Sequence, residues 1–486
     1  MSRLRDRTAD YLTILIASCA AGIGLLSAVG PGLAVAAFLA LIAVPTVVLR
    51  PKIMPHILVV ATFAQYVSFH GVTVQRLVTP LAVIAIVTHI VNEPARSRRP
   101  TVTLRWVTAY SALALASVAW TVSSSGTFKA LASLAIALTF MAAFILLVRD
   151  SEDLRALLRT VTAGSVVLAT WWIVSLIRGV DRAANPAGDP NFNAMLMAMA
   201  IPLVLALAIS ARTSGHRVAL LALITILAGA IVATLSRGGL VALLATTLSV
   251  ALLPTQTLFR SRSQRFVSFL AVVLGLMVLL ALAWSSLSAR FEEGFTQANK
   301  GSGRGDLWLA AIYSYRHNPI TGIGYGAFSA TSQELLATTP GVNLQNFLHF
   351  SRLQGQEAHN AYLGSLTELG PLGLVFFLGI LFATARSLLR SARRASLAGD
   401  PFLCSVGNAL AISLLAFSVS SFFLSTETSG RGLWMIIGLS VALPTILREE
   451  LSTGFRHAFP KALGGARPER HPRIERGAIL RRGLHP

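Results

Sequence analysis

The sequence has few charged residues and almost no cysteine. Charged side chains make up 13% of the 486 residues, hydrophobic ones make up 54%, and the mean hydropathy is +0.67. This composition excludes a soluble globular protein. The two cysteines, Cys19 and Cys404, both lie in apolar runs, so the chain offers neither a disulfide framework nor a cysteine-based metal site. What remains is the composition of a protein with many membrane spans.

Acidic residues are also scarce, since 20 Asp and Glu stand against 41 Lys and Arg, for a formal net charge of +21. The basic excess recurs in every second short loop, as at Arg50 and Lys52. Because cytoplasmic loops retain Lys and Arg, this pattern predicts that both termini are cytoplasmic. No nucleic-acid-binding motif accompanies the charge. We therefore expect attraction to anionic membrane lipids and no binding to nucleic acid.

Long apolar runs recur along the chain. Crossing a hydrocarbon core of ~30 Å takes ~20 mainly apolar helical residues. The first two runs are separated only by Gly30-Pro31 and could form a re-entrant hairpin, so the sequence predicts an all-α polytopic membrane protein with 12 to 14 transmembrane helices. The runs are residues 11–29, 31–49, 54–70, 72–91, 105–122, 127–148, 155–177, 191–210, 217–233, 238–253, 266–287, 360–385, 402–423 and 430–447.

One long polar segment, residues 288–358, separates the eleventh and twelfth predicted spans. The charge pattern places it outside the cytoplasm, as a large extracytoplasmic loop. We expect residues 1–447 to form a single transmembrane domain and residues 448–486 to form a basic, disordered cytoplasmic tail. The acidic cluster at residues 150–153 lies on the cytoplasmic side, and we interpret it as a helix cap without a catalytic role.

Ten basic residues disobey the charge rule, because they lie on the outer side or in the outer half of a span. Such charges are costly unless they are paired or line a wet cavity, so they are candidates for function. Arg76 could instead extend to the lipid headgroups. Arg237 lies in a Ser-Arg-Gly-Gly turn whose exposed backbone N–H groups suit an anion such as pyrophosphate. The ten are Arg76, Arg178, Arg182, Arg237, Arg290, Lys300, Arg304, Arg316, Arg352 and Arg431.

Four polar stretches on the predicted outer side, taken together in their order and spacing, resemble the O-antigen ligase and polymerase family. The stretches are residues 188–194, residues 236–239, residues 304–308 with 318–328, and residues 359–363 with 368–373. The resemblance covers residues 185–385 by motif and implies a multi-pass enzyme of the bacterial cytoplasmic membrane whose site faces the extracytoplasmic side. Its donor would be a glycan on polyprenyl (undecaprenyl or decaprenyl) diphosphate, and its acceptor a hydroxyl of a glycan or lipid. It implies no cofactor and no metal.

By the same resemblance, Arg237 and Arg304 bind the diphosphate and His359 is the general base. Guanidinium groups bind the charge that develops on a leaving diphosphate and stay ionised at any relevant pH. A neutral imidazole that accepts the proton of the acceptor hydroxyl could add roughly 10²- to 10⁴-fold to the rate. A direct displacement that inverts the anomeric carbon needs only this set. Supporting candidates are Arg76, Asp189, Asn191, Ser236, Tyr325, Asn360 and Glu368.

Alternative roles stay open for several of these residues. His317 and His349 lie in the same outer segment and could replace His359 as the base, and His359 could be only a polar residue at a helix start. Tyr325 could stack on a sugar or anchor the chain at the interface. We interpret residues 322–326 as a tight turn and the step from Gly370 to Pro371 as a helix kink.

The motifs do not distinguish a ligase, whose acceptor is a lipid core, from a polymerase, whose acceptor is another lipid-linked repeat. A transporter or flippase for lipid-linked sugars would also collect arginines in a cavity. Such proteins often contain internal repeats, and none is visible in this sequence. A structural scaffold of a glycan-export assembly would require neither His359 nor the outer arginines.

Overall fold

The computed structural model describes most of the helical part of the chain. The described residues are 42–69, 72–93, 101–180, 188–252, 303–344, 355–425 and 430–458, together with the single positions 277, 281 and 288. The predicted spans at residues 11–29 and 266–287 lie almost wholly outside these ranges, as does the part of the predicted tail beyond residue 458. The span count of 12 to 14 therefore stays a prediction. Residues 448–458, which were predicted to be disordered, are helical and form the end of α17 (Arg431–Ala458).

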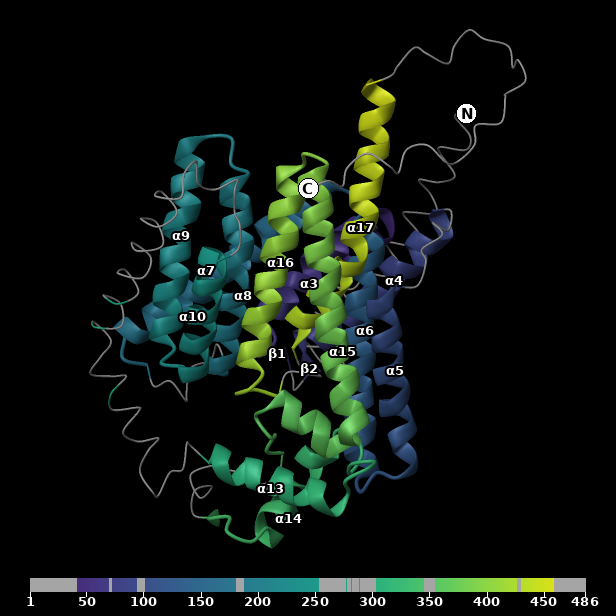
Figure 1. Ribbon diagram of the computed structural model, residues 1–486, viewed down its shortest axis with the longest axis vertical. Helices are drawn as coiled ribbons and strands as arrows, with labels where there is room; N and C mark the ends of the chain where they lie inside the picture. The colour runs from purple at the N-terminus through teal and green to yellow at the C-terminus, as the bar shows by residue number, and fades with distance from the viewer. Residues whose placement is uncertain are drawn as a thin grey trace, which may run out of the picture.

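Helices make up nearly all of the regular structure (Figure 1). The elements are η1 (Pro51–Ile53), α3 (Met54–Phe63), β1 (Ser68–Phe69), β2 (Val72–Thr73), α4 (Val74–Asn92), α5 (Val102–Ala116), η2 (Ser117–Ala119), α6 (Ser124–Leu147), α7 (Ser151–Ile177), α8 (Pro190–Ile209), α9 (Ser214–Ala233), α10 (Arg237–Leu252), α13 (Arg304–His317), α14 (Ala327–Thr338), α15 (Ala361–Leu397), α16 (Pro401–Ser420) and α17 (Arg431–Ala458).

Nine helices among the described residues are long and apolar enough to cross a membrane, or ten if one bent pair counts as a span. The all-α polytopic class is confirmed. The bent pair, Ile42–Leu49 and Pro51–Phe63, turns by 107° at a proline, which lacks the N–H that a continuous helix needs. The predicted runs 31–49 and 54–70 are thus two arms of one broken element in their described parts. The second run was also predicted too long, because the chain leaves α3 at Phe63 and forms the β1–β2 hairpin.

Helix α8 occupies the centre of one half of the bundle. Its span is 89% buried, and it packs against α7, α9, α10 and α16 (Figure 1). An apolar membrane helix can face lipid, so the enclosure of α8 follows from its packing against these four helices and not from its composition alone. The second half of the bundle contains α4, α5, α6, α15 and α17, and α15 packs on α16 to join the two halves. The first residues of α8 are therefore held in place on every side.

Helix α15 is divided by a kink. Gly370 has φ +67° and ψ −169°, which is not helical, and Pro371 follows it. A side chain at Gly370 would overlap the carbonyl oxygen of Ile320, in the turn between α13 and α14. The predicted kink is confirmed, and it brings the polar segment against the first part of α15. Within that segment, α13 and α14 pack on each other and on α15.

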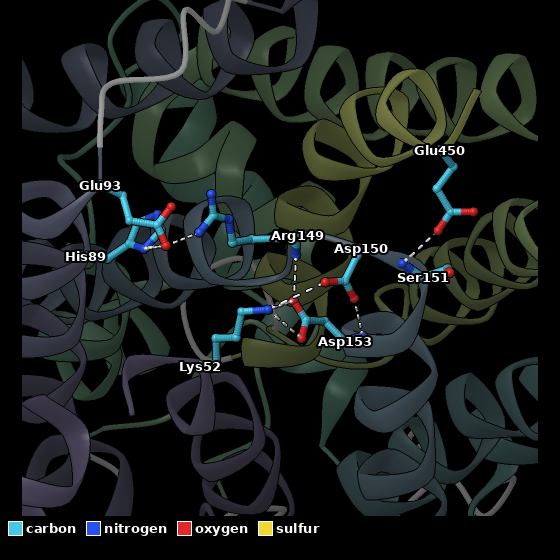
Figure 2. A network of polar contacts seen from close by, with 8 residues as sticks. All are labelled: Lys52, His89, Glu93, Arg149, Asp150, Ser151, Asp153 and Glu450. Carbon is cyan, nitrogen blue, oxygen red and sulfur yellow. Dashed lines mark hydrogen bonds and ion pairs between the residues drawn. The ribbon is translucent and has the colours of Figure 1, made fainter. Parts of the chain in front are cut away.

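Charged side chains join the helices at one end of the bundle (Figure 2). The Lys52 ammonium lies 3.0 Å from the Asp153 carboxylate, and the Arg149 guanidinium pairs with Glu93. These contacts connect the start of α3, the start of α7, the end of α6 and the end of α4. We predict that this end is cytoplasmic, because the short basic loops belong to it.

The acidic cluster at residues 150–153 caps α7, as predicted. Asp150 Oδ1 accepts a hydrogen bond from the backbone N–H of Asp153 at 2.7 Å. The backbone N–H of Ser151 donates to Glu450 Oε1 at 3.1 Å, which connects the start of α7 to the last turns of α17 (Figure 2). The acids therefore satisfy N–H groups at a helix start and stabilise this end of the bundle.

Candidate active site

The starts of α8 and α10 meet through one side-chain hydrogen bond. Asp189 precedes α8, and its Oδ1 accepts hydrogen bonds from the backbone N–H groups of Asn191 at 2.6 Å and Phe192 at 3.2 Å. The Ser236 hydroxyl donates to Asn191 Oδ1 at 2.7 Å and accepts from the backbone N–H of Gly239 at 3.0 Å. Ser236 thus caps α10 and fixes that helix to the start of α8.

The two predicted diphosphate-binding arginines each open a helix. Arg237 is the first residue of α10 and Arg304 is the first residue of α13, and both side chains are half-buried. Gly303, before Arg304, has φ +76°, a conformation that glycine adopts without strain. The first N–H groups of a helix lack partners within the helix, and the helix dipole is positive at that end. Each arginine therefore lies where the backbone also favours an anion.

His359 stands directly before α15, within electrostatic range of two other motifs. Its ring is half-buried, and the structure shows no hydrogen-bond partner for its buried Nδ1 among the described residues. Desolvation lowers the pKa of His359, the positive charge of Arg304 lowers it further, and the negative charge of Asp189 raises it. The fold has therefore brought together residues from three of the four motifs, around a ring that is neutral at neutral pH.

The backbone has the same arrangement before α15 and before α10. His359 has φ +50°, and Asn360 after it caps α15 by accepting N–H groups of Tyr362 and Leu363 at 3.1 and 3.0 Å. Before α10, Leu235 has φ +52° and is followed by the cap Ser236. In both places a residue with left-handed backbone precedes a capping side chain, and the helix begins at once.

Glu368 has a structural partner. Its Oε2 accepts the backbone N–H of Gly326 at 2.7 Å, and its Oε1 accepts that of Phe328 at 3.2 Å, so it holds the start of α14 on α15. The predicted tight turn is confirmed, because Gly322, Gly324 and Gly326 all have positive φ. Both carboxylate oxygens of Glu368 accept hydrogen bonds from the backbone, so the structure gives this residue a structural role.

Tyr325 and Arg76 have contacts of their own in the structure. The Tyr325 side chain is 1% exposed, and its ring packs edge-on against Tyr110 at 6.1 Å, so this conformation does not present it to a sugar. Arg76 is exposed in the first turn of α4 and acts electrostatically on Arg431. The buried Arg431 donates to Gln75 Oε1 at 3.2 Å. These contacts do not test a role for Arg76.

The alternative base His317 is less enclosed than His359. His317 is exposed at the end of α13, and its ring lies 4.4 Å from the ring of Tyr313. His349 lies outside the described residues. Within the described ranges, no three His, Cys, Asp or Glu side chains gather as a metal-binding group would require. Metal-independent transfer stays a prediction.

Sequence analysis did not select Glu357, two residues before His359. Glu357 borders a cavity of about 560 Å³ and its side chain is exposed to water there, and Lys129 of α6 borders the same cavity. Desolvation and the negative charge of Asp189 raise the pKa of Glu357 to about 7. Two features of the sequence could have indicated this site: Glu357 lies close to the motif histidine, and Lys129 lies near the predicted outer end of a span.

Residues 220–378 match a family model described as O-Antigen ligase. The match includes Arg237, Arg304 and His359, and it confirms the resemblance that the four motifs indicated. Asp189 and Asn191 lie before the matched stretch, and the structure connects them to it through Ser236. A search of curated proteins finds no match to the chain.

Proposed function

We propose, on the premise of an O-antigen ligase domain at residues 220–378, that this protein transfers a glycan from a polyprenyl diphosphate to an acceptor hydroxyl. The family assignment supports a membrane glycan transferase of the ligase or polymerase type. The reaction takes place at the outer face of the bacterial cytoplasmic membrane. The observation that carries the proposal is the grouping of Asp189, Arg304 and His359 where α8, α13 and α15 begin.

The diphosphate binds between the two helix starts that Arg237 and Arg304 open. Each guanidinium can donate two parallel hydrogen bonds to a phosphate, and the first N–H groups of α10 and α13 add to the positive potential. As the glycosyl phosphate bond breaks, negative charge accumulates on the leaving diphosphate. Groups already placed around that charge lower the barrier without reorganising.

His359 takes up the proton of the acceptor. The acceptor oxygen forms a bond to the anomeric carbon while the bond from that carbon to the phosphate oxygen breaks. The electron pair of the broken bond leaves with the diphosphate, and the hydroxyl proton moves to the imidazole. Attack from the side opposite the diphosphate inverts the anomeric carbon. The lowered pKa of His359 keeps the ring free of a proton before the reaction.

The test is transfer by the purified protein in detergent, with a polyprenyl-diphosphate oligosaccharide and candidate acceptors. His359→Ala and Arg304→Ala should each reduce turnover at least ~100-fold, as loss of a general base or a charge-stabilising group does. His317→Ala and Arg316→Ala remove the same groups from exposed positions on α13 and should stay within about twofold of the parent. Normal turnover in His359→Ala, with a parent protein that is active, would contradict the assigned base.

Donor supplied alone separates the two family activities. A polymerase lengthens the lipid-linked glycan with no other acceptor, because the donor itself carries acceptor hydroxyls. A ligase forms product only when a different acceptor is added. Gel or mass analysis of the lipid-linked products distinguishes the two results, and release of free glycan into water in both conditions would contradict transfer.

A further inference from the structure

A polar cavity lies beside the segment that leads to His359. It is the cavity of about 560 Å³ between α6, α14 and the first part of α15. Helix α14 packs against both α6 and α15, and its first residues form part of the cavity lining. Pockets for small ligands have volumes of ~300–1,000 Å³, so this cavity has the capacity for one to a few sugar rings.

The lining of the cavity suits a polyhydroxylated ligand. Hydroxyl groups come from several serines, and one cation, Lys129, and two carboxyl groups, those of Glu357 and Glu368, lie among them. Serine both donates and accepts hydrogen bonds, as a sugar hydroxyl does, and hydrogen bonds to charged groups are stronger than those to neutral groups. The polar side chains include Ser123, Ser125, Lys129, Ser329, Glu357 and Ser425.

The position of the cavity relative to His359 indicates which substrate it holds. Glu357 and Ala358 form part of its wall, and His359 follows them in the chain. The negative charge of Asp189 raises the pKa of both Glu357 and His359. Asp189 lies at the start of α8, which is hydrogen-bonded to the start of α10, where Arg237 lies. The short segment before α15 thus borders the cavity and lies within electrostatic range of Asp189, at the start of α8, and of Arg304, which opens α13.

An inverting displacement places the acceptor oxygen and the leaving diphosphate on opposite sides of the anomeric carbon. We infer that the cavity between α6, α14 and α15 binds the terminal sugar of the acceptor and directs its hydroxyl to His359. The inference rests on the proposed transfer reaction and deepens it. Lys129 and Glu357 act as specificity-determining residues that contact hydroxyl or charged groups of the acceptor from two walls.

Reversible blocking of the cavity tests this inference without relying on a variant that could fail to fold. Ser125 is exposed and lines the cavity, whereas its neighbour Ser124 is equally exposed and is not part of the lining. Ser125→Cys and Ser124→Cys are purified, modified with a benzyl methanethiosulfonate and then restored with dithiothreitol. Both variants retain Cys19 and Cys404, so any reaction at those thiols is common to the pair.

The acceptor probe is lipid-free oligosaccharide released by mild acid from the envelope of the source cells, which is chemically distinct from the lipid-linked donor. We expect modification of Ser125→Cys to raise the KM for this acceptor at least tenfold, with the KM for donor within twofold, and reduction to restore both. Modified Ser124→Cys should stay within twofold of the parent for both substrates. Lys129→Gln should raise the acceptor KM at least threefold, with Arg316→Gln as the control.

A rise in donor KM, or no change in either KM, would overturn the acceptor assignment. Failure of the proposed function has a different signature. In that case the unmodified parent protein transfers glycan to no acceptor, and blocking has nothing to inhibit.

Discussion

His359 holds a backbone conformation that costs a residue with a Cβ roughly 1–2 kcal/mol. We predict that His359→Gly and His359→Ala both lose transfer, because neither carries an imidazole. The glycine variant should unfold at the same temperature as the alanine variant or above it, because glycine adopts φ +50° without strain. Thermal unfolding in detergent measures the difference. An alanine variant that is clearly the more stable of the two would mean that the turn before α15 is not left-handed.

The charges around His359 predict opposite shifts of the pH profile in two variants. Transfer needs the neutral ring, so kcat/KM should fall as pH drops through the lowered pKa of His359. Arg304→Gln removes a charge that lowers this pKa and should move the acid limb to higher pH. Asp189→Asn removes a charge that raises the pKa and should move the limb to lower pH, while asparagine still caps α8.

Residual turnover of each variant, followed from acid to neutral pH, provides the measurement. Shifts in the same direction in both variants, or an unchanged acid limb in both, would exclude His359 as the titrating base.

Helices α8 and α10 approach so closely that a methyl group at Gly239 would overlap Ala194. We predict that Gly239→Ala lowers the free energy of unfolding by about 1–3 kcal/mol, as overpacking does. Transfer should fall as well, because Arg237 lies two residues away in the same turn. Gly215→Ala is the matched control, since a side chain there meets nothing within 4 Å. Equal unfolding temperatures of the two variants would show that α10 is held less tightly than the structure indicates.

The sequence predicted the apolar helices from α4 onward to within a few residues at most ends, because a long apolar run has few alternatives to a membrane helix. It did not predict α13 and α14, which lie in the polar segment. The end of α3 at Phe63 and the hairpin after it were not predicted, because residues 54–70 are apolar on average and their hydropathy does not show where the helix ends. The bond from Ser236 to Asn191 joins residues 45 positions apart and depends on how α10 docks on α8. The residues around Ser236 and around Asn191 do not indicate, from sequence alone, that the two side chains are in contact.

For the molecule as a whole, the distribution of basic residues predicts which end faces outward. Ile320, between α13 and α14, is 79% exposed, and Leu397, at the end of α15, is 81% exposed. In a background of Cys19→Ser and Cys404→Ser, a membrane-impermeant maleimide should label Ile320→Cys on intact spheroplasts. Leu397→Cys should be labelled only after lysis. The reverse labelling would place His359 on the cytoplasmic side and contradict an outer-face reaction.

At the same scale, the motifs included Asp189, Arg304 and His359, which the fold places within electrostatic range of one another, but they did not indicate the cavity. Arg237, Arg304 and His359 were recognisable from local sequence around each of them. The cavity arises where α6 and α14 come together, and its lining is mostly serine and small residues that occur throughout the chain. Glu357 acquires its raised pKa only from the surroundings that the fold supplies.

Among the described residues, Leu235 and His359 are the non-glycine residues with positive φ, and each stands one residue before the cap of a helix at the site. Strain of this kind costs about 1–3 kcal/mol per residue and persists only where the surrounding packing compensates for it. The shape of the site is therefore determined when the protein folds, before any substrate arrives, and little reorganisation is left for binding. Substitutions selected only for thermal stability should relax these two turns first. The resulting proteins would have higher unfolding temperatures and lower rates of transfer.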